Sequence, residues 1–164
     1  MRENTCCFTG HRAQKLPWRF NEKDRRCLDM IDELTIRLEN AISFGYNTFM
    51  SGMALGFDMI AVETLLKLKK KHKDIKIIAC VPWEAQDERW PEEQKKRYRT
   101  LLKKVDFIRC VNKTYTDECL HERNHYMIDN SGLCIALFNG LPGGTQKTIE
   151  YAERQGVKVD IIKP

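Results

Sequence analysis

Short β-like runs and helical patterns alternate along the whole chain, and this alternation constrains the fold more than any other feature. Runs rich in β-branched, aromatic and other apolar residues predict strands. They cover Thr5–Thr9, Tyr46–Met50, Ile75–Val81, Val105–Val111, Leu133–Phe138 and Val157–Ile162. Segments with apolar residues at helical spacing lie between them. The alternation predicts an α/β protein: a single Rossmann-like domain over residues 1–164, with a mostly parallel sheet of about six strands and helices on both faces.

Residue types that begin or stop helices set the predicted helix boundaries. Asn21 and Thr145 are the expected caps of the first and last helices, and Gly45 and Gly156 are expected to end them. The second helix should follow a glycine turn to about His72, the third should run from Pro91 to Lys104, and the fourth from Cys119 to Asn130. Pro82 is expected to end the third strand.

A glycine-rich segment, Ser51-Gly-Met-Ala-Leu-Gly-Phe-Asp58, lies where a predicted strand turns into a helix. Gly52 and Gly56 can take positive φ and let the backbone approach a ligand closely. The unpaired N–H groups at the start of the helix favour an anion. We therefore interpret the segment as a phosphate-binding turn. The alternative is that Gly52 only makes a turn and Asp58 only caps the helix.

Polar and glycine-rich loops also follow other strands: Gly10-His11-Arg12, Pro82–Gln86 and Asn139–Thr145. Ligands of open parallel sheets bind beyond the carboxyl ends of the strands, so these loops predict one shared site. The last loop is a second phosphate-type turn, because Gly143 and Gly144 permit close approach and Thr145 offers a hydroxyl at a helix start. The predicted ligand-binding residues are Gly10, His11, Arg12, Ser51, Gly52, Met53, Ala54, Gly56, Asp58, Pro82, Gln86, Arg123, Asn139, Gly140, Gly143, Gly144 and Thr145. Two purely structural turns are the alternative.

Several side chains in these loops suit a nucleotide. His11 and Arg12 would favour an anion, and a protonated His11 could donate to a phosphate. Trp83 and Trp90 flank Gln86, so the indoles could stack on a base while the amide reads its edge. Closing a loop or mediating a dimer is the alternative role for the two tryptophans.

The segment His121-Glu-Arg-Asn-His125 matches the zinc-protease pattern of two histidines at i and i+4 around a glutamate. A catalytic zinc also needs a third protein ligand, and no histidine follows His125. Only Glu150 and Glu153 are nearby downstream carboxylates, on the helix that opens from the glycine loop. We therefore expect no metal, and interpret the histidines as helix-surface residues.

The composition of the chain limits where we expect the protein to be located and what we expect it to bind. The sequence has no apolar run of membrane-spanning length and no basic segment followed by an apolar stretch at its start, so we expect a cytoplasmic protein without a membrane partner. Seven cysteines in such a chain are expected to be reduced thiols. The net charge of +5 is mild. Much of this charge comes from a lysine cluster at 67–73. The cluster is not interleaved with aromatic residues that could stack on bases, so it does not favour nucleic-acid binding.

Four segments carry a resemblance to a known family: Cys7-Phe-Thr-Gly-His-Arg12, Ser51–Asp58, Pro82 with Gln86 and Trp90, and Asn139-Gly with Gly143-Gly-Thr145. From about residue 5 to 160 the chain resembles the bacterial YpsA-like family of the SLOG superfamily. That superfamily also includes the DNA-processing protein A family and the LONELY GUY cytokinin-activating phosphoribohydrolases. The resemblance implies a single SLOG domain that binds a nucleotide or a nucleotide derivative, with an ADP-ribose or NAD-like compound as the usual conjecture. It implies no firm cofactor and no established reaction.

The resemblance also singles out Arg123. The stretch His121–Asn124 followed by Ser131–Leu137 is similar to the part of LONELY GUY enzymes in which an arginine-bearing helix leads into the strand before the glycine loop. The donor fork of Arg123 could hold a phosphate. A salt bridge to a neighbouring helix is the alternative.

LONELY GUY enzymes carry a glutamate three residues after the threonine of this loop, where it takes part in N-glycosidic cleavage. Thr148 stands at that position when the Gly144-Thr145 pair is aligned, which puts the same activity in doubt here. A different register would place Glu150 there but would disrupt the loop. Asp58 and Glu63 remain candidate catalytic carboxylates, with helix capping and solvent exposure as their alternatives.

The chain is therefore expected to bind a small nucleotide derivative as a sensor or regulator. The first alternative is a hydrolase on the same site that cleaves an N-glycosidic or phosphoanhydride bond, with Arg123 holding phosphate. The second alternative is a nucleic-acid-binding module that uses the lysine cluster. The sequence leaves the oligomeric state open, although relatives with this architecture often form homodimers.

Overall fold

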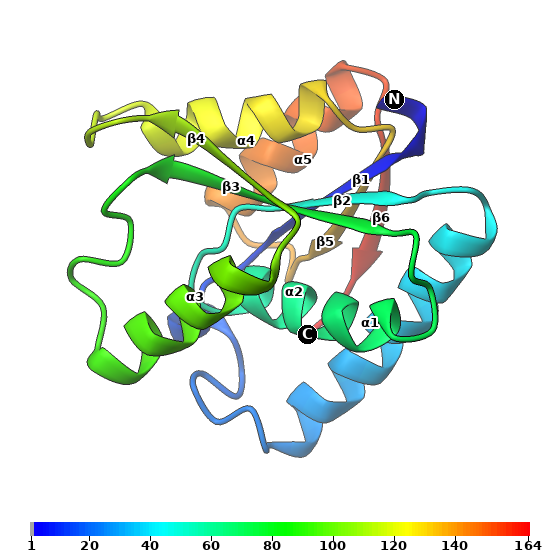
Figure 1. The fold of residues 1–164 in the computed structure, drawn as a ribbon, viewed down its shortest axis with the longest axis horizontal. Helices are drawn as coiled ribbons and strands as arrows, with labels where there is room; N and C mark the ends of the chain where they lie inside the picture. The colour runs from blue at the N-terminus through cyan, green and yellow to red at the C-terminus, as the bar shows by residue number, and fades with distance from the viewer. Residues whose placement is uncertain (1) are drawn as a thin grey trace.

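The computed structural model describes residues 2–164 as one sheet with helices on both of its faces (Figure 1). The six strands are β1 (Thr5–Gly10), β2 (Thr48–Ser51), β3 (Lys76–Trp83), β4 (Phe107–Asn112), β5 (Leu133–Leu137) and β6 (Lys158–Ile162). The helices are α1 (Arg25–Ser43), α2 (Phe57–Lys69), α3 (Glu92–Lys104), α4 (Cys119–Asp129) and α5 (Gly144–Arg154). Every strand pair is parallel, so the predicted α/β, Rossmann-like architecture is confirmed.

The strand order β4-β3-β2-β1-β5-β6 places β1 and β5 side by side in the middle of the sheet. Strands β2, β3 and β4 follow β1 toward one edge of the sheet, and β6 follows β5 toward the other edge. Helices α1, α2 and α3 cover one face, and α4 and α5 cover the other (Figure 1). The order therefore reverses between β1 and β5. In folds of this type the crevice outside the carboxyl ends of such a strand pair is where ligands bind.

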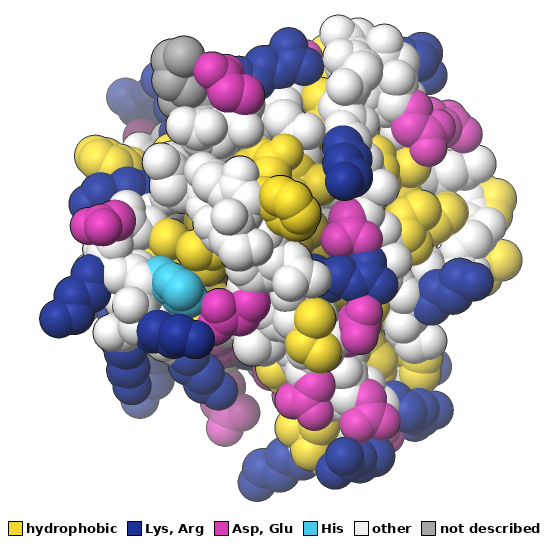
Figure 2. All heavy atoms as spheres, turned by 90° about the vertical axis from the view of Figure 1, so that its right-hand side faces the viewer, with side chains coloured by type: hydrophobic (Ala, Val, Ile, Leu, Met, Phe, Trp, Pro, Cys, Tyr) yellow, Lys and Arg dark blue, Asp and Glu magenta, His cyan; other side chains and the backbone are white. Residues whose placement is uncertain are grey.

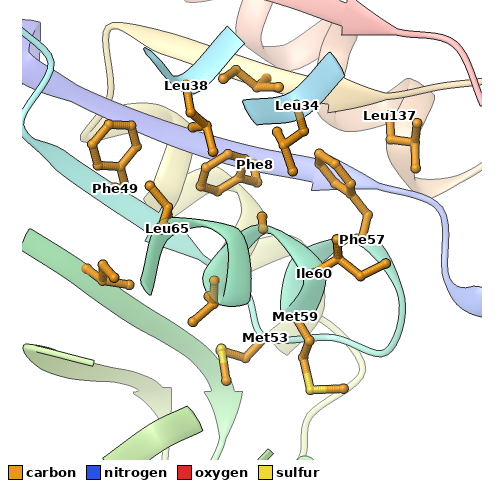
Figure 3. Packing of buried hydrophobic residues seen from close by; sticks show 14 of the residues in the cluster. Phe8, Leu34, Leu38, Phe49, Met53, Phe57, Met59, Ile60, Leu65 and Leu137 are labelled. Atoms are coloured by element: carbon orange, nitrogen blue, oxygen red, sulfur yellow. The ribbon is translucent and has the colours of Figure 1, made fainter. Parts of the chain in front are cut away.

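Successive side chains on each strand point to opposite faces of the sheet and fill two separate cores. Phe8 and Phe49 pack with α1 and α2, and Figure 3 shows them around Leu34, Leu38 and Leu65. Their sequence neighbours Cys7 and Met50 belong instead to the core under α4 and α5. Burial on both faces explains why β5 reads as one continuous apolar run, with all five of its residues buried.

The cap of α1 differs from the prediction. The helix begins after Asp24, whose carboxylate accepts a hydrogen bond from the Arg26 N–H at 2.9 Å. Asn21 lies in a preceding turn, where its side-chain oxygen accepts from the Lys23 N–H. Backbone hydrogen bonds from Asn21 to Trp18 and from Asp24 to Asn21 keep this segment in turns until the helix begins.

Two further boundaries were predicted wrongly. Gly143, not Thr145, is the N-cap of α5, and its φ of 152° is a backbone conformation that favours glycine. Strand β3 does not stop at Pro82 but continues to Trp83. Its last partner on β2 lies opposite Ala79, so beyond this residue β3 pairs only with β4, and a strand tolerates proline where one side is unpaired.

The lysine cluster at the end of α2 is partly neutralised. Lys69 contacts Asp106 at 2.5 Å, Lys71 lies 3.5 Å from Glu39, and His72 hydrogen-bonds the same glutamate. Figure 2 shows Lys and Arg side chains beside Asp and Glu side chains over the face that it presents.

Within residues 2–164, no helix has both the length and the apolar character needed to cross a bilayer.

Candidate functional site

A cavity of about 490 Å³ lies where the chain leaves β1 and enters α5, at the point where the strand order reverses. We call it the first cavity. Segments from β1, the loop after it, the glycine turn before α2, and the starts of α4 and α5 meet around it. It is lined by Phe8, Thr9, Gly10, His11, Arg12, Gln14, Lys15, Ala54, Asp58, Leu120, His121, Arg123, Asn124, Gly144 and Thr145.

The turn from Ser51 to Asp58 is closed by its own hydrogen bonds. The Ser51 hydroxyl donates to the Asp58 carbonyl at 2.9 Å and accepts from the Met53 N–H at 3.2 Å. The Asp58 carboxylate accepts from the Ala54 N–H at 3.2 Å, so it braces the turn and does not cap α2, whose N-cap is Gly56. Positive φ occurs at Gly56, as predicted, but at Met53 and not at Gly52.

Position 52 has no room for a side chain, because Arg123 lies against the glycine there. A Cβ atom on Gly52 would stand 2.5 Å from Nη1 and 2.6 Å from Cζ of Arg123, closer than any ordinary contact. Nη1 donates to the Gly52 carbonyl at 2.6 Å and to the Cys80 carbonyl at 3.3 Å, and Nε donates to the Asn124 side chain at 2.9 Å. The close approach at Gly52 is therefore made by a side chain of α4, which ties that helix to the glycine turn.

Arg123 and Asp58 are buried groups of opposite charge that act on each other electrostatically. Their exposed fractions are 4% and 7%. Burial raises the pKa of Asp58, and the charge of Arg123 acts in the opposite direction. Burial likewise lowers the pKa of Arg123, opposed by Asp58, although a guanidinium keeps its proton at any physiological pH. The two groups therefore support each other's charged forms inside the fold.

Two exposed cations stand at the rim of the first cavity. Arg12 is the second residue after the end of β1, and Lys15 lies in the short helical turn Ala13–Lys15. The Lys15 ammonium lies 3.4 Å from where a Cβ of Gly143 would be, so it sits over the glycine loop that begins α5. Sequence reasoning missed Lys15, although its position five residues after β1 could have indicated it.

His11 connects the end of β1 to this glycine loop. Its Nε2 accepts a hydrogen bond from the Asn139 N–H at 3.2 Å, so the proton of the neutral ring is on Nδ1. Burial lowers the pKa of His11, the Asn139 side chain acts in the opposite direction, and the charge of Lys15 lowers the pKa further. The ring also lies 5.9 Å from the ring of Phe138. The imidazole is thus held neutral as an acceptor that positions the loop.

A second cavity, of about 400 Å³, is lined by Arg12, Trp83, Gln86, Glu88, Arg89, Trp90 and Tyr115. Arg12 therefore lines both cavities. The buried Gln86 donates through Nε2 to the Gly52 carbonyl and to the Tyr98 hydroxyl, both at 3.3 Å. The carbonyl of Gly52 thus accepts from both Arg123 and Gln86, and it connects the walls of the two cavities.

The predicted residues divide into those that line a cavity and those that support one. Eight line the first cavity: Gly10, His11, Arg12, Ala54, Asp58, Arg123, Gly144 and Thr145. Gln86 joins Arg12 in the second. The others line neither cavity: Ser51 ends β2, Pro82 lies within β3, and Gly52, Met53, Gly56, Asn139, Gly140 and Gly143 lie in the surrounding turns. Gly56 packs on the loop after β1, where an added Cβ would meet the Ala13 nitrogen at 2.8 Å.

Glu63 lies apart from both cavities. Its carboxylate is paired with Arg97 of α3, which also holds Glu22 at 2.7 Å. Thr148 is buried, and its hydroxyl donates to the Gly144 carbonyl at 3.0 Å. The structure therefore brings Asp58, but neither Glu63 nor a carboxylate at position 148, to the first cavity.

The two histidines of the zinc-like pattern have different surroundings. His121 lines the first cavity, whereas the ring of His125 stacks on Tyr151 with centroids 3.8 Å apart. Glu122 accepts a hydrogen bond from the Asn112 side chain. Within the part of the chain that the structure describes, no group of three or more His, Cys, Asp or Glu residues could hold a metal ion.

Comparison with known proteins identifies similar chains. The profile described as the YspA SLOG family matches residues 6–164. An SPbeta prophage-derived protein of Bacillus subtilis, YoqJ, is 33% identical over 152 residues, which cover 85% of each chain. A UPF0398 protein of Halalkalibacterium halodurans is 28% identical over 151 residues, which cover 90% of this chain and 79% of the relative.

Solved structures share the fold. DNA processing protein A from Helicobacter pylori, described for its mode of binding single-stranded DNA, superimposes with a TM-score of 0.63 at 17% identity. Its counterpart from Streptococcus pneumoniae gives 0.63 at 16% identity. Both alignments cover 96% of this chain, but only 64% and 49% of those longer proteins.

Proposed function

The chain belongs to the YspA SLOG family, and on this premise we propose that it is a cytosolic protein that binds a nucleotide or a nucleotide derivative such as ADP-ribose or an NAD-like compound. The observation that carries the proposal is the charge of the first cavity. Three cations line it, namely Arg12, Lys15 and Arg123, and among residues 2–164 only Asp58 adds a carboxylate. This imbalance favours an anionic ligand.

The start of α5 supports a phosphate in this cavity. Gly144 and Thr145 line it, and the N–H groups of a first helical turn have no partner within the helix. An added Cβ on Gly144 would meet nothing within 4 Å, so the backbone is open on that side. Phosphates bind at such helix starts because the N–H groups and the helix dipole both favour negative charge. Lys15, beside Gly143, adds a full positive charge at the same place.

Arg123 can contribute to the same phosphate. Nε and Nη1 are engaged within the protein, whereas Nη2 has no hydrogen bond to any residue of the described chain. The guanidinium is fixed by those bonds, so a ligand oxygen would meet a donor that loses little conformational freedom on binding. Its charge is compensated by Asp58 only in part, because Arg12 lies near both groups.

The surroundings of the Asp58 carboxylate favour binding without turnover over hydrolysis. Its carboxylate accepts from the Ala54 N–H and so braces the glycine turn, while the charge of Arg123 acts on it electrostatically. A general base needs a free lone pair within reach of the proton that it takes. A hydrolase that cleaves an N-glycosidic or phosphoanhydride bond on this site remains the alternative, and it would have to use this same carboxylate.

The proposal is tested by calorimetric titration of ADP-ribose, NAD, ADP and AMP, with a single-stranded oligonucleotide beside them. Lys15→Ala should weaken the best ligand about tenfold or more, since hydrogen bonds to charged groups contribute about 1.5–3 kcal/mol. Lys70→Ala is the matched control, because Lys70 is an exposed lysine that lines neither cavity. Equal loss in the two variants, or no binding by wild-type protein, would contradict the proposal.

Two further readouts separate the alternatives. Product formation from the best ligand, lost in Asp58→Asn, would support the hydrolase. Binding of the oligonucleotide alone, with an affinity that falls steeply as salt increases, would support a nucleic-acid-binding module.

A further inference from the structure

We propose that the second cavity is the subsite for a planar heteroaromatic ring, the base or nicotinamide of the ligand whose phosphate lies in the first cavity. The inference rests on the proposed function for the phosphate and adds where the ring binds. The ligand would then be a complete nucleotide, because a sugar phosphate would fill the first cavity and leave the second one empty.

Aromatic side chains from three segments form the second cavity. Trp83 ends β3, Trp90 precedes α3, and Tyr115 comes from the loop between β4 and α4. The rings of Trp83 and Tyr115 meet edge to face, with centroids 5.2 Å apart and an interplanar angle of 78°. Trp90 is held in the same way against Tyr98, at 5.0 Å and 74°. These contacts fix the ring planes, so a ligand ring would stack on a surface that is already ordered.

Tyr115 is an exposed aromatic residue at the edge of the second cavity. Its side chain is 59% exposed although it contacts Trp83. A tyrosine and two tryptophans around a cavity with two arginines offer stacking on both aromatic rings and guanidinium planes. Proteins that bind single-stranded nucleic acids stack the bases in this way. An apolar peptide would leave Arg12, Glu88 and Arg89 without partners.

Arg12 makes the two cavities parts of one site. It lines both of them, and it is the second residue after the end of β1. A single ligand can therefore pass this guanidinium with its phosphate on one side and its ring on the other. No other residue lines both cavities within residues 2–164.

Gln86 offers a hydrogen-bond acceptor that lacks a partner. The side chain is 5% exposed, and its Nε2 is bonded to Gly52 and Tyr98, but Oε1 is buried with no partner among the described residues. An unsatisfied buried oxygen is costly, so polar groups of this kind are usually completed by a ligand or by water. Gln86 lines the second cavity, so a ring that carries an amine or amide N–H, as adenine and nicotinamide do, would supply the missing donor once the side chain turns its oxygen toward the cavity.

The test uses probes that contain one part of the ligand each. Adenosine carries a ring without phosphate, ribose 5-phosphate carries phosphate without a ring, and AMP and nicotinamide mononucleotide carry both. Binding is measured by calorimetry and by tryptophan fluorescence, because two of the three tryptophans line the second cavity and the third, Trp18, is buried. Trp83→Phe then shows whether the fluorescence change comes from the stacking ring.

We expect Tyr115→Ala and Trp83→Ala to weaken AMP by about fivefold to 150-fold, the range for loss of one stacked base, and to leave ribose 5-phosphate unchanged. Phe107→Ala is the matched control, since Phe107 is an aromatic residue with the same 59% exposure that lines neither cavity. Comparison of AMP with nicotinamide mononucleotide tells which ring is preferred.

The inference is overturned if AMP binds equally well to wild-type protein, Tyr115→Ala and Trp83→Ala while Lys15→Ala weakens it, because the whole ligand would then lie in the first cavity. It is also overturned if the aromatic variants change only self-association or only oligonucleotide binding. Failure of the proposed function looks different. Adenosine would still change the Trp83 fluorescence, but ribose 5-phosphate would not bind and Lys15→Ala would have no effect.

Discussion

The guanidinium of Arg123 lies so close to Gly52 that even a methyl group on that glycine would stand 2.5 Å from Nη1. Gly52→Ala should therefore push Arg123 away from the Gly52 carbonyl and destabilise the fold by about 1–3 kcal/mol, the usual cost of overpacking. Urea denaturation measures this change. Gly144→Ala serves as the control, because a Cβ there meets nothing within 4 Å, and it should leave the free energy of unfolding nearly unchanged. Equal stability of the two variants would contradict this account of Gly52.

Arg123 and Asp58 should behave as one unit in a double-mutant cycle. Arg123→Met removes the charge that opposes the rise in the pKa of the buried Asp58 carboxylate, together with the hydrogen bonds from Nη1 to the Gly52 and Cys80 carbonyls. Since a hydrogen bond from a charged group contributes about 1.5–3 kcal/mol, the single variant should be clearly destabilised. In the double variant Arg123→Met with Asp58→Asn no buried charge remains, so the loss should be well below the sum of the two single losses. Chemical denaturation of the four proteins gives the coupling. If the losses of unfolding free energy in the two single variants add up to the loss in the double variant, the two side chains do not interact.

The hydrogen bond from Asn139 to His11 predicts a pH dependence of stability. Burial lowers the pKa of His11 in the folded state below its ordinary value of 6.5, so the neutral ring is favoured by folding. The contribution is therefore complete above pH 6.5 and is lost as the pH falls through the lower folded-state pKa, where protonation removes the acceptor on Nε2. Thermal unfolding between pH 8 and 5 should show a steeper loss for wild-type protein than for His11→Asn. Parallel curves would exclude His11 as the cause.

The fold could be predicted from local patterns because each strand and helix has its own signature. The five buried residues from Leu133 to Leu137 read as a central strand without any tertiary information. The cap of α1 could not be predicted in this way. Asn21 and Asp24 are both good caps, and the choice depends on the turns that hold residues 18–24 out of the helix.

The edge of the sheet at which the first cavity lies was also predictable, but the contacts around the cavity were not. Parallel strands bring their carboxyl ends to one edge, so Gly10 and Gly144 were expected in the same site, and both line the first cavity. The contact between Gly52 and Arg123 joins residues 71 positions apart, and no local signal indicates it. For the same reason the glycine at position 52 was interpreted as space for a ligand, although an arginine side chain fills that space.

Glu63 and Asp58 should give opposite results when their charges are removed. Glu63 pairs with Arg97 away from both cavities, so Glu63→Gln should reduce stability by about 1 kcal/mol or less, as for partly exposed ion pairs, and leave nucleotide affinity unchanged. Asp58→Asn should change affinity, because that carboxylate lines the first cavity beside Arg123. Calorimetry with the best ligand, together with urea denaturation, separates the two effects. A loss of affinity in Glu63→Gln would return that residue to the candidate site.

Arg12 should be the one side chain whose removal weakens both halves of the ligand, because it lines both cavities. Arg12→Ala takes away a donor to the phosphate and a guanidinium plane beside the ring, so ribose 5-phosphate and adenosine should each bind more weakly. Lys15→Ala should weaken ribose 5-phosphate alone, and Tyr115→Ala should weaken adenosine alone. Arg12 is exposed and has no ion pair among the described residues, so its loss should leave the free energy of unfolding within about 0.5 kcal/mol of the wild-type value. Calorimetric titration of the three variants with the two probes tests this pattern, and an Arg12→Ala protein that loses only one of the two affinities would show that the cavities bind separate ligands.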